Sequence, residues 1–198
     1  MLCLIRSTPP RWAEIAADDL DRVLADHAHC EMKAATNALS LATRWPATPR
    51  VARALTDLAE EELRHFREVL ALLEQRGVEL GRPDVDGYAA ELRRAANASS
   101  DKTPAGSLAD RLLVGALIEA RSCERFRLLA DALAARGDAL ASFYEDLFTC
   151  EARHYKTLVD LAVEVLGDEP RVRARLAEIA RVEGDIAARL GVRPTIHG

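Results

Sequence analysis

The amino-acid sequence predicts an all-α protein, and two observations carry that prediction. Apolar residues recur at intervals of three and four along almost the whole chain, which is the period of a helix with one buried face. Alanine, leucine, arginine and glutamate are abundant, whereas β-branched and aromatic residues are few. This composition excludes a β-sandwich, a collagen-like chain and a disulfide scaffold.

The length and charge indicate one ordinary globular domain, which we expect to comprise residues 1–198. A chain of 198 residues with 49% hydrophobic and 30% charged residues can bury a core without disulfides and lies far from disordered compositions. With 27 Lys and Arg against 32 Asp and Glu, the formal net charge is −5.

The helical period predicts five long helices and one short one. Breaks in the period coincide with Trp45-Pro46, Gly77, Gly137-Asp138 and Gly167, followed by Pro170. Residues 78–107 differ from the rest because they hold five Gly and Pro residues around a short helical piece. The expected long helices are residues 17–43, 49–76, 107–136, 139–166 and 171–190, with the short helix at 88–98.

The connection lengths indicate how these helices are arranged. Short links join the first helix to the second and the third to the fourth, so each pair should be antiparallel. The long middle segment lets the third helix start at the other end of the bundle. We therefore expect a ferritin-like four-helix bundle with one long crossover and an additional C-terminal helix.

Targeting and cysteine patterns predict a soluble cytoplasmic protein without a membrane segment. The apolar stretch before Arg6 is too short for a secretory signal, and no window approaches the roughly 20 apolar residues of a membrane span. Cys3, Cys30, Cys123 and Cys150 form no Cys-x-x-Cys pair, so we expect free thiols in a reducing compartment.

Carboxylates and imidazoles interrupt the apolar faces of all four long bundle helices. The sequence contains Glu-x-x-His twice, and each copy follows a single Glu on the preceding helix, at intervals of 31 and 32 residues. Burying so many carboxylates requires a shared cation or pairing with arginines. The candidate residues are Glu31, Glu62, His65, Glu119, Glu151 and His154.

The spacing favours a dinuclear metal site over a buried salt-bridge network. Residues i and i+3 share a helix face, so Glu and His of one motif can bind the same metal pair. Two single Glu residues with two Glu-x-x-His motifs form the ligand set of di-iron and di-manganese carboxylate bundles. We expect two iron ions, because open positions on ferrous ions offer a place for O₂.

Three further residues lie beside these ligands in the sequence. His27 precedes Glu31 by one turn on the same apolar face, and we expect it to lie just outside the metal ligands or to be an ordinary core histidine rather than to bind metal. Glu61 could orient a ligating histidine, but a solvated charge is an equal interpretation. Cys123 follows Glu119 by one turn and could line the cavity, although a small buried hydrophobe is the simpler interpretation.

The sequence around these residues resembles the MiaE family of tRNA hydroxylases over nearly the whole chain, from about Pro9 to Leu190. The matching segments are residues 28–35, 61–66, 118–126 and 151–155. The Arg-Ser-Cys-Glu-Arg-Phe run at 121–126 and the Cys-Glu at 30–31 distinguish this family from other ferritin-like proteins.

The resemblance implies a non-haem di-iron monooxygenase. Its substrate would be 2-methylthio-N6-isopentenyladenosine beside the anticodon of tRNA, with one allylic methyl hydroxylated by O₂ and two external electrons. The six candidate ligands match the family's iron ligands at every position. The chain has no cysteine cluster and no dinucleotide-binding motif, so a separate reductase is expected.

Recognition of tRNA has weaker support in the sequence. A net charge of −5 is not typical of nucleic-acid-binding proteins, although several acids are used at the metal site. Arg44, Arg50 and Arg53 have no acid between them and are candidates for contacting the anticodon loop, but solvated helix charges are an equal interpretation. The sequence leaves the oligomeric state open, a monomer included.

Alternative functions share the same ligand set. They are a ferritin- or rubrerythrin-like protein that stores iron or removes peroxide, and a di-iron oxygenase of another substrate such as a lipid or quinone. A purely structural bundle would leave the buried carboxylates unexplained.

Overall fold

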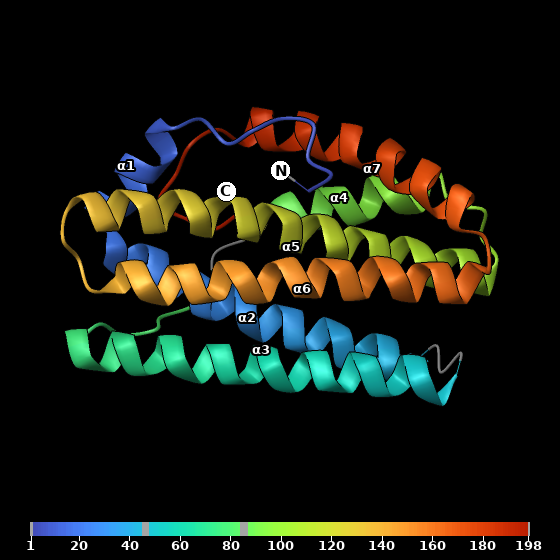
Figure 1. Ribbon diagram of the computed structural model, residues 1–198, viewed down its shortest axis with the longest axis horizontal. Helices are drawn as coiled ribbons and strands as arrows, with labels where there is room; N and C mark the ends of the chain where they lie inside the picture. Colours follow the sequence, from blue (N-terminus) through green and yellow to red (C-terminus); the bar gives the residue numbers. More distant parts are fainter. Residues whose placement is uncertain (1, 45–47, 84–86, 198) are drawn as a thin grey trace. The chain divides into compact units, whose positions relative to one another are not determined.

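The computed structural model describes residues 2–44, 48–83 and 87–197, and all regular secondary structure within these ranges is α-helix (Figure 1). None of the helices there is both long and apolar enough to cross a membrane. The elements are α1 (Arg11–Asp18), α2 (Leu20–Arg44), α3 (Pro49–Arg76), α4 (Gly87–Ala98), α5 (Pro104–Ala135), α6 (Leu140–Leu166) and α7 (Glu169–Leu190).

The chain forms two compact units, each of which contains one of the predicted helix pairs. The α2–α3 unit comprises residues 19–85 and 194–196, and the α5–α6 unit comprises residues 1–18, 86–193 and 197–198. In each unit the two named helices lie side by side (Figure 1). The two predicted hairpins are therefore confirmed.

The second predicted helix agrees with α3 at both ends because its caps are strong. Thr48 has an extended backbone, and its side chain accepts a hydrogen bond of 3.2 Å from the Val51 N–H, with Pro49 in the first turn. Gly77 ends the helix with a φ of +67°, a left-handed conformation that favours glycine. The predicted break at Trp45-Pro46 lies outside the described residues.

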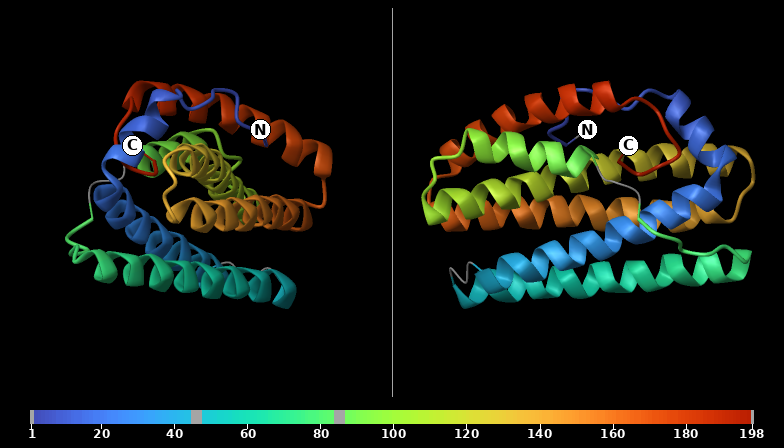
Figure 2. Two further views of the ribbon diagram at one scale, coloured as in Figure 1. Left: turned by 60° about the vertical axis from the view of Figure 1, so that its left-hand side comes forward. Right: turned by 180° about the vertical axis from the view of Figure 1, so that it is seen from behind.

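Helix α5 is the centre of its own unit. It packs against α1, α4, α6 and α7, and Figures 1 and 2 show α4 lying between α7 and α5. Residues 112–117 and 119–126 of α5 are all buried. This stretch of α5 has almost no contact with solvent, so its polar residues must find partners inside the protein.

Apart from the start of the first helix, the other helix ends lie within three residues of the predicted ends. Helix α5 begins at Pro104 rather than Ser107, because Thr103 accepts a hydrogen bond of 3.0 Å from the Gly106 N–H. Helix α7 begins at Glu169 rather than Arg171, with Asp168 as its cap and Pro170 in the first turn. The short predicted helix at 88–98 is α4, and Gly167 ends α6 with a φ of +65°.

The prediction of one first helix over residues 17–43 is wrong at its start. Helix α1 ends at Asp18, and α2 begins at Leu20. Helix α1 packs on α5, and it buries Trp12, Ala13, Ala16 and Ala17. The apolar period continues through the break, so periodicity does not show that the helix is interrupted at Asp19.

Candidate metal centre

All six predicted ligands are buried in the structure. The largest exposed fraction among them is 6%, for Glu119, and the smallest is 1%, for Glu62. Their faces of the helices are otherwise lined by apolar residues such as Leu24, Leu55, Leu112 and Leu158. Carboxylates at this depth need a compensating cation or a proton.

Three of the ligands converge within the α2–α3 unit. Glu31 comes from α2, and Glu62 and His65 come from α3. The His65 Nδ1 atom lies 3.6 Å from an oxygen of Glu31 and 3.6 Å from an oxygen of Glu62. We call Glu31, Glu62 and His65 the first triad.

The other three ligands converge within the α5–α6 unit. Glu119 comes from α5, and Glu151 and His154 come from α6. The His154 Nδ1 atom lies 3.6 Å from an oxygen of Glu151, and one ligand atom from each of the three residues lies within 4.8 Å of the others. Glu119, Glu151 and His154 form the second triad.

The donor atoms of both triads suit a first-row metal ion. A separation of 3.6 Å is longer than a hydrogen bond. Ligand atoms bound to one ion at about 2.1 Å lie about 3.0–3.4 Å apart, so a small adjustment of each triad accommodates an ion. Carboxylate oxygens with one imidazole nitrogen are donors that fit iron or manganese.

The predicted neighbours of the ligands have different surroundings. His27 is fully buried, and its Nε2 atom lies 2.7 Å from Oε1 of Glu31. Glu61 is half-buried on α3 beside Glu62. Arg64 contacts the Nε2 atom of His65 at 3.4 Å, which places a cation against the ring edge away from the triad.

Cys123 lies on α5 one turn after Glu119 and is buried. Its thiol faces the backbone oxygen of Phe148 on α6, at 3.6 Å. Burial, reinforced by the negative charges of Glu151 and Glu124, raises the pKa of the Cys123 thiol to about 12. The side chain therefore stays a neutral thiol at physiological pH.

The three arginines predicted to contact tRNA lie at one end of the α2–α3 unit. Arg44 is the last residue of α2, and Arg50 and Arg53 lie in the first two turns of α3. All three are exposed. Because α2 ends at Arg44 and α3 begins at Pro49, the three arginines lie at the same end of the hairpin.

A buried charged network centred on Arg121 was not predicted from the sequence. The Arg121 guanidinium donates to both oxygens of Glu183 on α7, at 2.9 and 3.0 Å, and also to Glu124. It also donates to the Thr8 hydroxyl at 3.1 Å and to the Arg6 carbonyl at 2.9 Å. All five N–H groups of the guanidinium are thus used.

The rest of the network completes the pairing of these charges. Glu124 accepts hydrogen bonds from the backbone and side chain of Thr8, and Tyr88 donates to Glu183 at 2.8 Å. Arg125 lies 5.1 Å from the ring centre of Trp12, and burial lowers its pKa to about 10. The network attaches the N-terminal segment and α7 to α5.

One signal in the sequence could have revealed this network. Arg121, Glu124 and Arg125 belong to the run that distinguishes the family, and they lie on a stretch of α5 in which residues 119–126 are all buried. Spaced at i, i+3 and i+4, they share one face of α5. Charges on a fully buried helix indicate partners from other segments.

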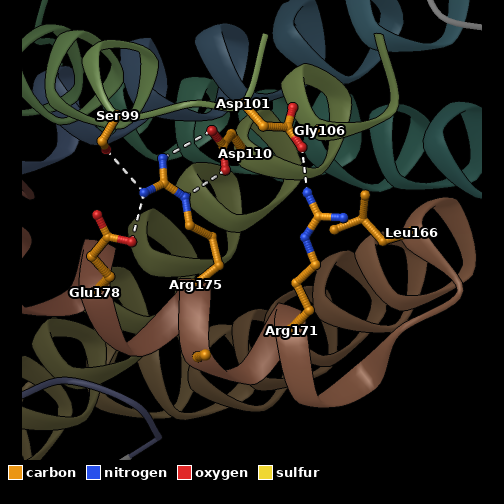
Figure 3. Close-up of a pocket in the computed structure, with 9 residues that line it drawn as sticks. Ser99, Asp101, Gly106, Asp110, Leu166, Arg171, Arg175 and Glu178 are labelled. Atoms are coloured by element: carbon orange, nitrogen blue, oxygen red, sulfur yellow. Dashed lines mark hydrogen bonds and ion pairs between the residues drawn. The ribbon is translucent and has the colours of Figure 1, made fainter. Parts of the chain in front are cut away.

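A surface pocket of about 310 Å³ lies in the α5–α6 unit and contains no triad residue (Figure 3). Arg175 binds both oxygens of Asp110 and also contacts Ser99 and Glu178, while Arg171 pairs with Asp101. Both arginines therefore form ion pairs with acidic residues that also line the pocket. These ion pairs attach the start of α7 to the start of α5.

Comparison with known proteins identifies relatives along most of the chain. The model of the MiaE family, described as tRNA-(MS2IO6A)-hydroxylase, matches residues 2–198. A tRNA 2-(methylsulfanyl)-N(6)-isopentenyladenosine(37) hydroxylase of Pseudomonas putida is 41% identical over 174 residues, covering 88% of this chain and 80% of its own. A protein of the same name from Salmonella typhimurium is 30% identical over 228 residues, covering 90% of this chain and 81% of its own.

A solved structure shares the fold. It is described as Protein 43 with aldehyde deformylating oxygenase activity from Synechococcus, and it is 36% identical with a TM-score of 0.88. The match covers 100% of this chain and 96% of the other. This likeness confirms the predicted ferritin-like, all-α fold class, and the family match over the whole described chain confirms the resemblance: the protein belongs to the MiaE family of tRNA hydroxylases.

Proposed function

We propose that this protein is an O₂-dependent tRNA hydroxylase that acts on the isopentenyl group of 2-methylthio-N6-isopentenyladenosine next to the anticodon. The observation that carries the proposal is the family match over residues 2–198, together with two curated relatives named as hydroxylases of this nucleoside. Two buried triads of the same composition support the proposal, because their carboxylates and imidazoles could hold the metal ions that the oxidative chemistry requires.

We propose further that the two units form one ferritin-like domain in which the triads complete a single di-iron centre. Each triad alone provides three protein ligands, and together they provide four carboxylates and two imidazoles, which is the ligand set of dinuclear carboxylate bundles. When bound, two ferrous ions would supply the reduction of O₂ to an oxidant strong enough for an unactivated C–H bond.

The residues of the chain itself would hold and orient the metal ions and isolate them from water. The glutamates would carry the charge that binds two dications, and the histidines would complete the coordination as neutral donors. Apolar residues on the same helix faces exclude water, which keeps electrostatic interactions strong within the site. Cys123, held as a thiol by its raised pKa, adds no charge beside the second triad.

Two partners are required by this chemistry. Electrons must come from outside, so we propose a separate reductase. The substrate base must leave its stack to reach a buried site, which a single-stranded anticodon loop permits more readily than a duplex. The cytoplasm is the expected location because tRNA is the proposed substrate.

The arginines at the end of the α2–α3 hairpin are the proposed contacts for tRNA phosphates. We expect Arg50→Glu to raise the Kd for substrate tRNA by on the order of tenfold and to lower the salt dependence of binding, since a phosphate contact becomes a repulsion. Filter binding at several salt concentrations measures both. Arg67→Glu, an exposed arginine farther along α3, is the control and should bind as wild type; equal losses in the two variants would reject the interface.

Nucleoside mass spectrometry tests the proposed reaction. tRNA from cells that lack their own hydroxylase is analysed with and without expression of this chain. We expect the 2-methylthio-isopentenyl nucleoside to gain one oxygen atom only when the chain is expressed. The Glu62→Ala variant provides the matched negative control.

The same experiment distinguishes the alternative functions. No oxygen gain by a soluble protein that carries about two irons per chain would favour iron handling or another oxygenase substrate. The likeness to the Synechococcus protein makes an aldehyde the first substitute substrate to assay. If the nucleoside gains no oxygen and the protein binds no metal, both the hydroxylase proposal and the metal site would be rejected.

A further inference from the structure

Beyond Glu31, the exposed residues of α2 are uncharged as far as Thr43. They are Met32, Thr36, Leu39 and Thr43, and the exposed Arg44 follows them as the last residue of the helix. Spacings of four, three and four residues place the uncharged ones on one face of α2. We call Met32, Thr36, Leu39 and Thr43 the α2 stripe.

The α2 stripe offers mainly apolar surface to solvent. Met32 is 36% exposed, and Leu39 is 43% exposed. The Thr36 hydroxyl donates to the backbone oxygen of Met32 at 2.8 Å, and the Thr43 hydroxyl donates to that of Leu39 at 3.1 Å. Both hydroxyl protons are thus used within the helix. Exposed apolar surface bordered by polar residues is typical of interaction sites.

The chain around the α2 stripe is also free of acidic residues. No aspartate or glutamate occurs from residue 32 to residue 56, although a chain with 32 acidic residues among 198 would place about four in a stretch of this length. The same stretch holds the basic residues Lys33, Arg44, Arg50 and Arg53. It therefore carries a formal charge of +4 in a protein whose net charge is −5.

The absence of acids is local to one end of the α2–α3 hairpin. Over residues 57–68 of α3, the exposed side chains carry both signs of charge. They are Asp57, Glu60, Arg64, Arg67 and Glu68. The positive surface therefore belongs to the last turns of α2 and the first turns of α3, which lie at the same end of the hairpin (Figure 1).

A partner for this surface must combine negative charge with exposed apolar groups. Arginine binds phosphates well, and the absence of carboxylates removes a source of repulsion. The unstacked bases of a single-stranded RNA loop present flat apolar faces beside a phosphate backbone. The nucleoside of the proposed function adds a methylthio group and an isopentenyl group, and both are apolar. These features favour an RNA loop as the partner.

The α2 stripe also runs between the two sites that the proposed function requires. Met32 directly follows Glu31 of the first triad, and Thr43 directly precedes Arg44. At a rise of 1.5 Å per residue, the stripe is about 17 Å long. A loop whose phosphates lie at the arginines can therefore extend its bases along α2 to the level of Glu31.

We propose that the α2 stripe is the docking surface for the unstacked bases of the anticodon loop, while the arginines at its end hold the phosphates. This inference rests on the proposed function and adds the surface on which the substrate is bound. Its distinguishing feature is an apolar contribution to RNA binding, which salt does not screen.

Filter binding with an anticodon stem-loop that carries 2-methylthio-N6-isopentenyladenosine tests the inference. Leu39→Glu places a carboxylate in the middle of the α2 stripe and should raise the Kd by on the order of tenfold, the effect of losing a base contact. Leu39→Ser should also raise the Kd but keep the wild-type salt dependence, because no charge changes. Arg53→Gln should instead lower the salt slope by about 0.7, the value of one phosphate contact on a single strand.

Val182→Glu is the matched control, because Val182 on α7 is 37% exposed and lies outside the α2 stripe. It should bind the stem-loop as the wild type does. Equal Kd values for Leu39→Glu and Val182→Glu, with circular dichroism showing both folded and the wild type hydroxylating tRNA, would overturn the inference and leave the proposed function intact.

Two other results would also be decisive. If Leu39→Glu changes the oligomeric state or the binding of anionic phospholipid vesicles but not the Kd for the stem-loop, the stripe binds a second copy or a membrane, and the inference is overturned. A wild type that neither binds nor hydroxylates the stem-loop would instead overturn the proposed function itself.

Discussion

We expect Glu151→Ala to lose hydroxylation of the isopentenyl nucleoside and to lose more than about 100-fold in metal affinity. Glu151 is 2% exposed, and it shares the second triad with His154, one turn farther along α6. Removing an outer partner of a ligand costs about 10–100-fold in affinity, so removing a ligand itself should cost more. Nucleoside mass spectrometry and metal analysis of the purified variant measure the two effects.

Stability measurements give this prediction a second, independent readout. In the metal-free protein the carboxylates of Glu119 and Glu151 lie within 4.8 Å of each other, and like charges at this distance repel. Metal-free Glu151→Ala should therefore be at least as stable as the metal-free wild type. With metal present the order should reverse, because only the wild type gains the full binding free energy.

The control for this substitution is Glu145→Ala on the same helix. Glu145 is exposed and pairs with Arg127 at 2.8 Å, away from the triad. It should keep activity, metal content and stability close to wild-type values. Full activity of Glu151→Ala with two irons per chain would contradict the di-iron mechanism.

Arg121→Ala should lower the free energy of unfolding by about 3–5 kcal/mol, the usual cost of removing one partner from a buried ion pair. Arg121 is 1% exposed, and its removal would leave the carboxylates of Glu124 and Glu183 buried without their cation. The N-terminal segment would also lose the hydrogen bond from Arg121 to the Arg6 carbonyl. Urea denaturation followed by circular dichroism measures the change.

Arg127→Ala is the matched control for this measurement. Arg127 lies on the same helix and pairs with Glu145, but its side chain is 42% exposed, so its removal should cost less than about 1 kcal/mol. Arg121→Lys should recover only part of the loss, because lysine has three donors where arginine uses five. Equal destabilisation by Arg121→Ala and Arg127→Ala would show that the network contributes no more than a surface pair.

The helices were predictable where local signals agree with each other. Helix α3 has a threonine cap, a proline in its first turn and a glycine at its end, and both of its bounds follow from the sequence. The break between α1 and α2 was not predictable, because Trp12, Ala16 and Leu20 continue the period of three and four through it. Helix α1 packs on α5, a contact between distant segments that the period of a sequence does not show.

The helical class, the two hairpins and the residues of both triads could be predicted from the amino-acid sequence. This was possible because the period of a helix translates directly into a face, and Glu-x-x-His on an apolar face has few physical explanations. The packed structure was needed to show which oxygen of Glu31 His27 contacts, and that Arg121 pairs with segments as distant as Thr8 and Glu183. Such contacts join residues more than 60 positions apart or depend on side-chain rotamers, and neither leaves a periodic trace in a sequence.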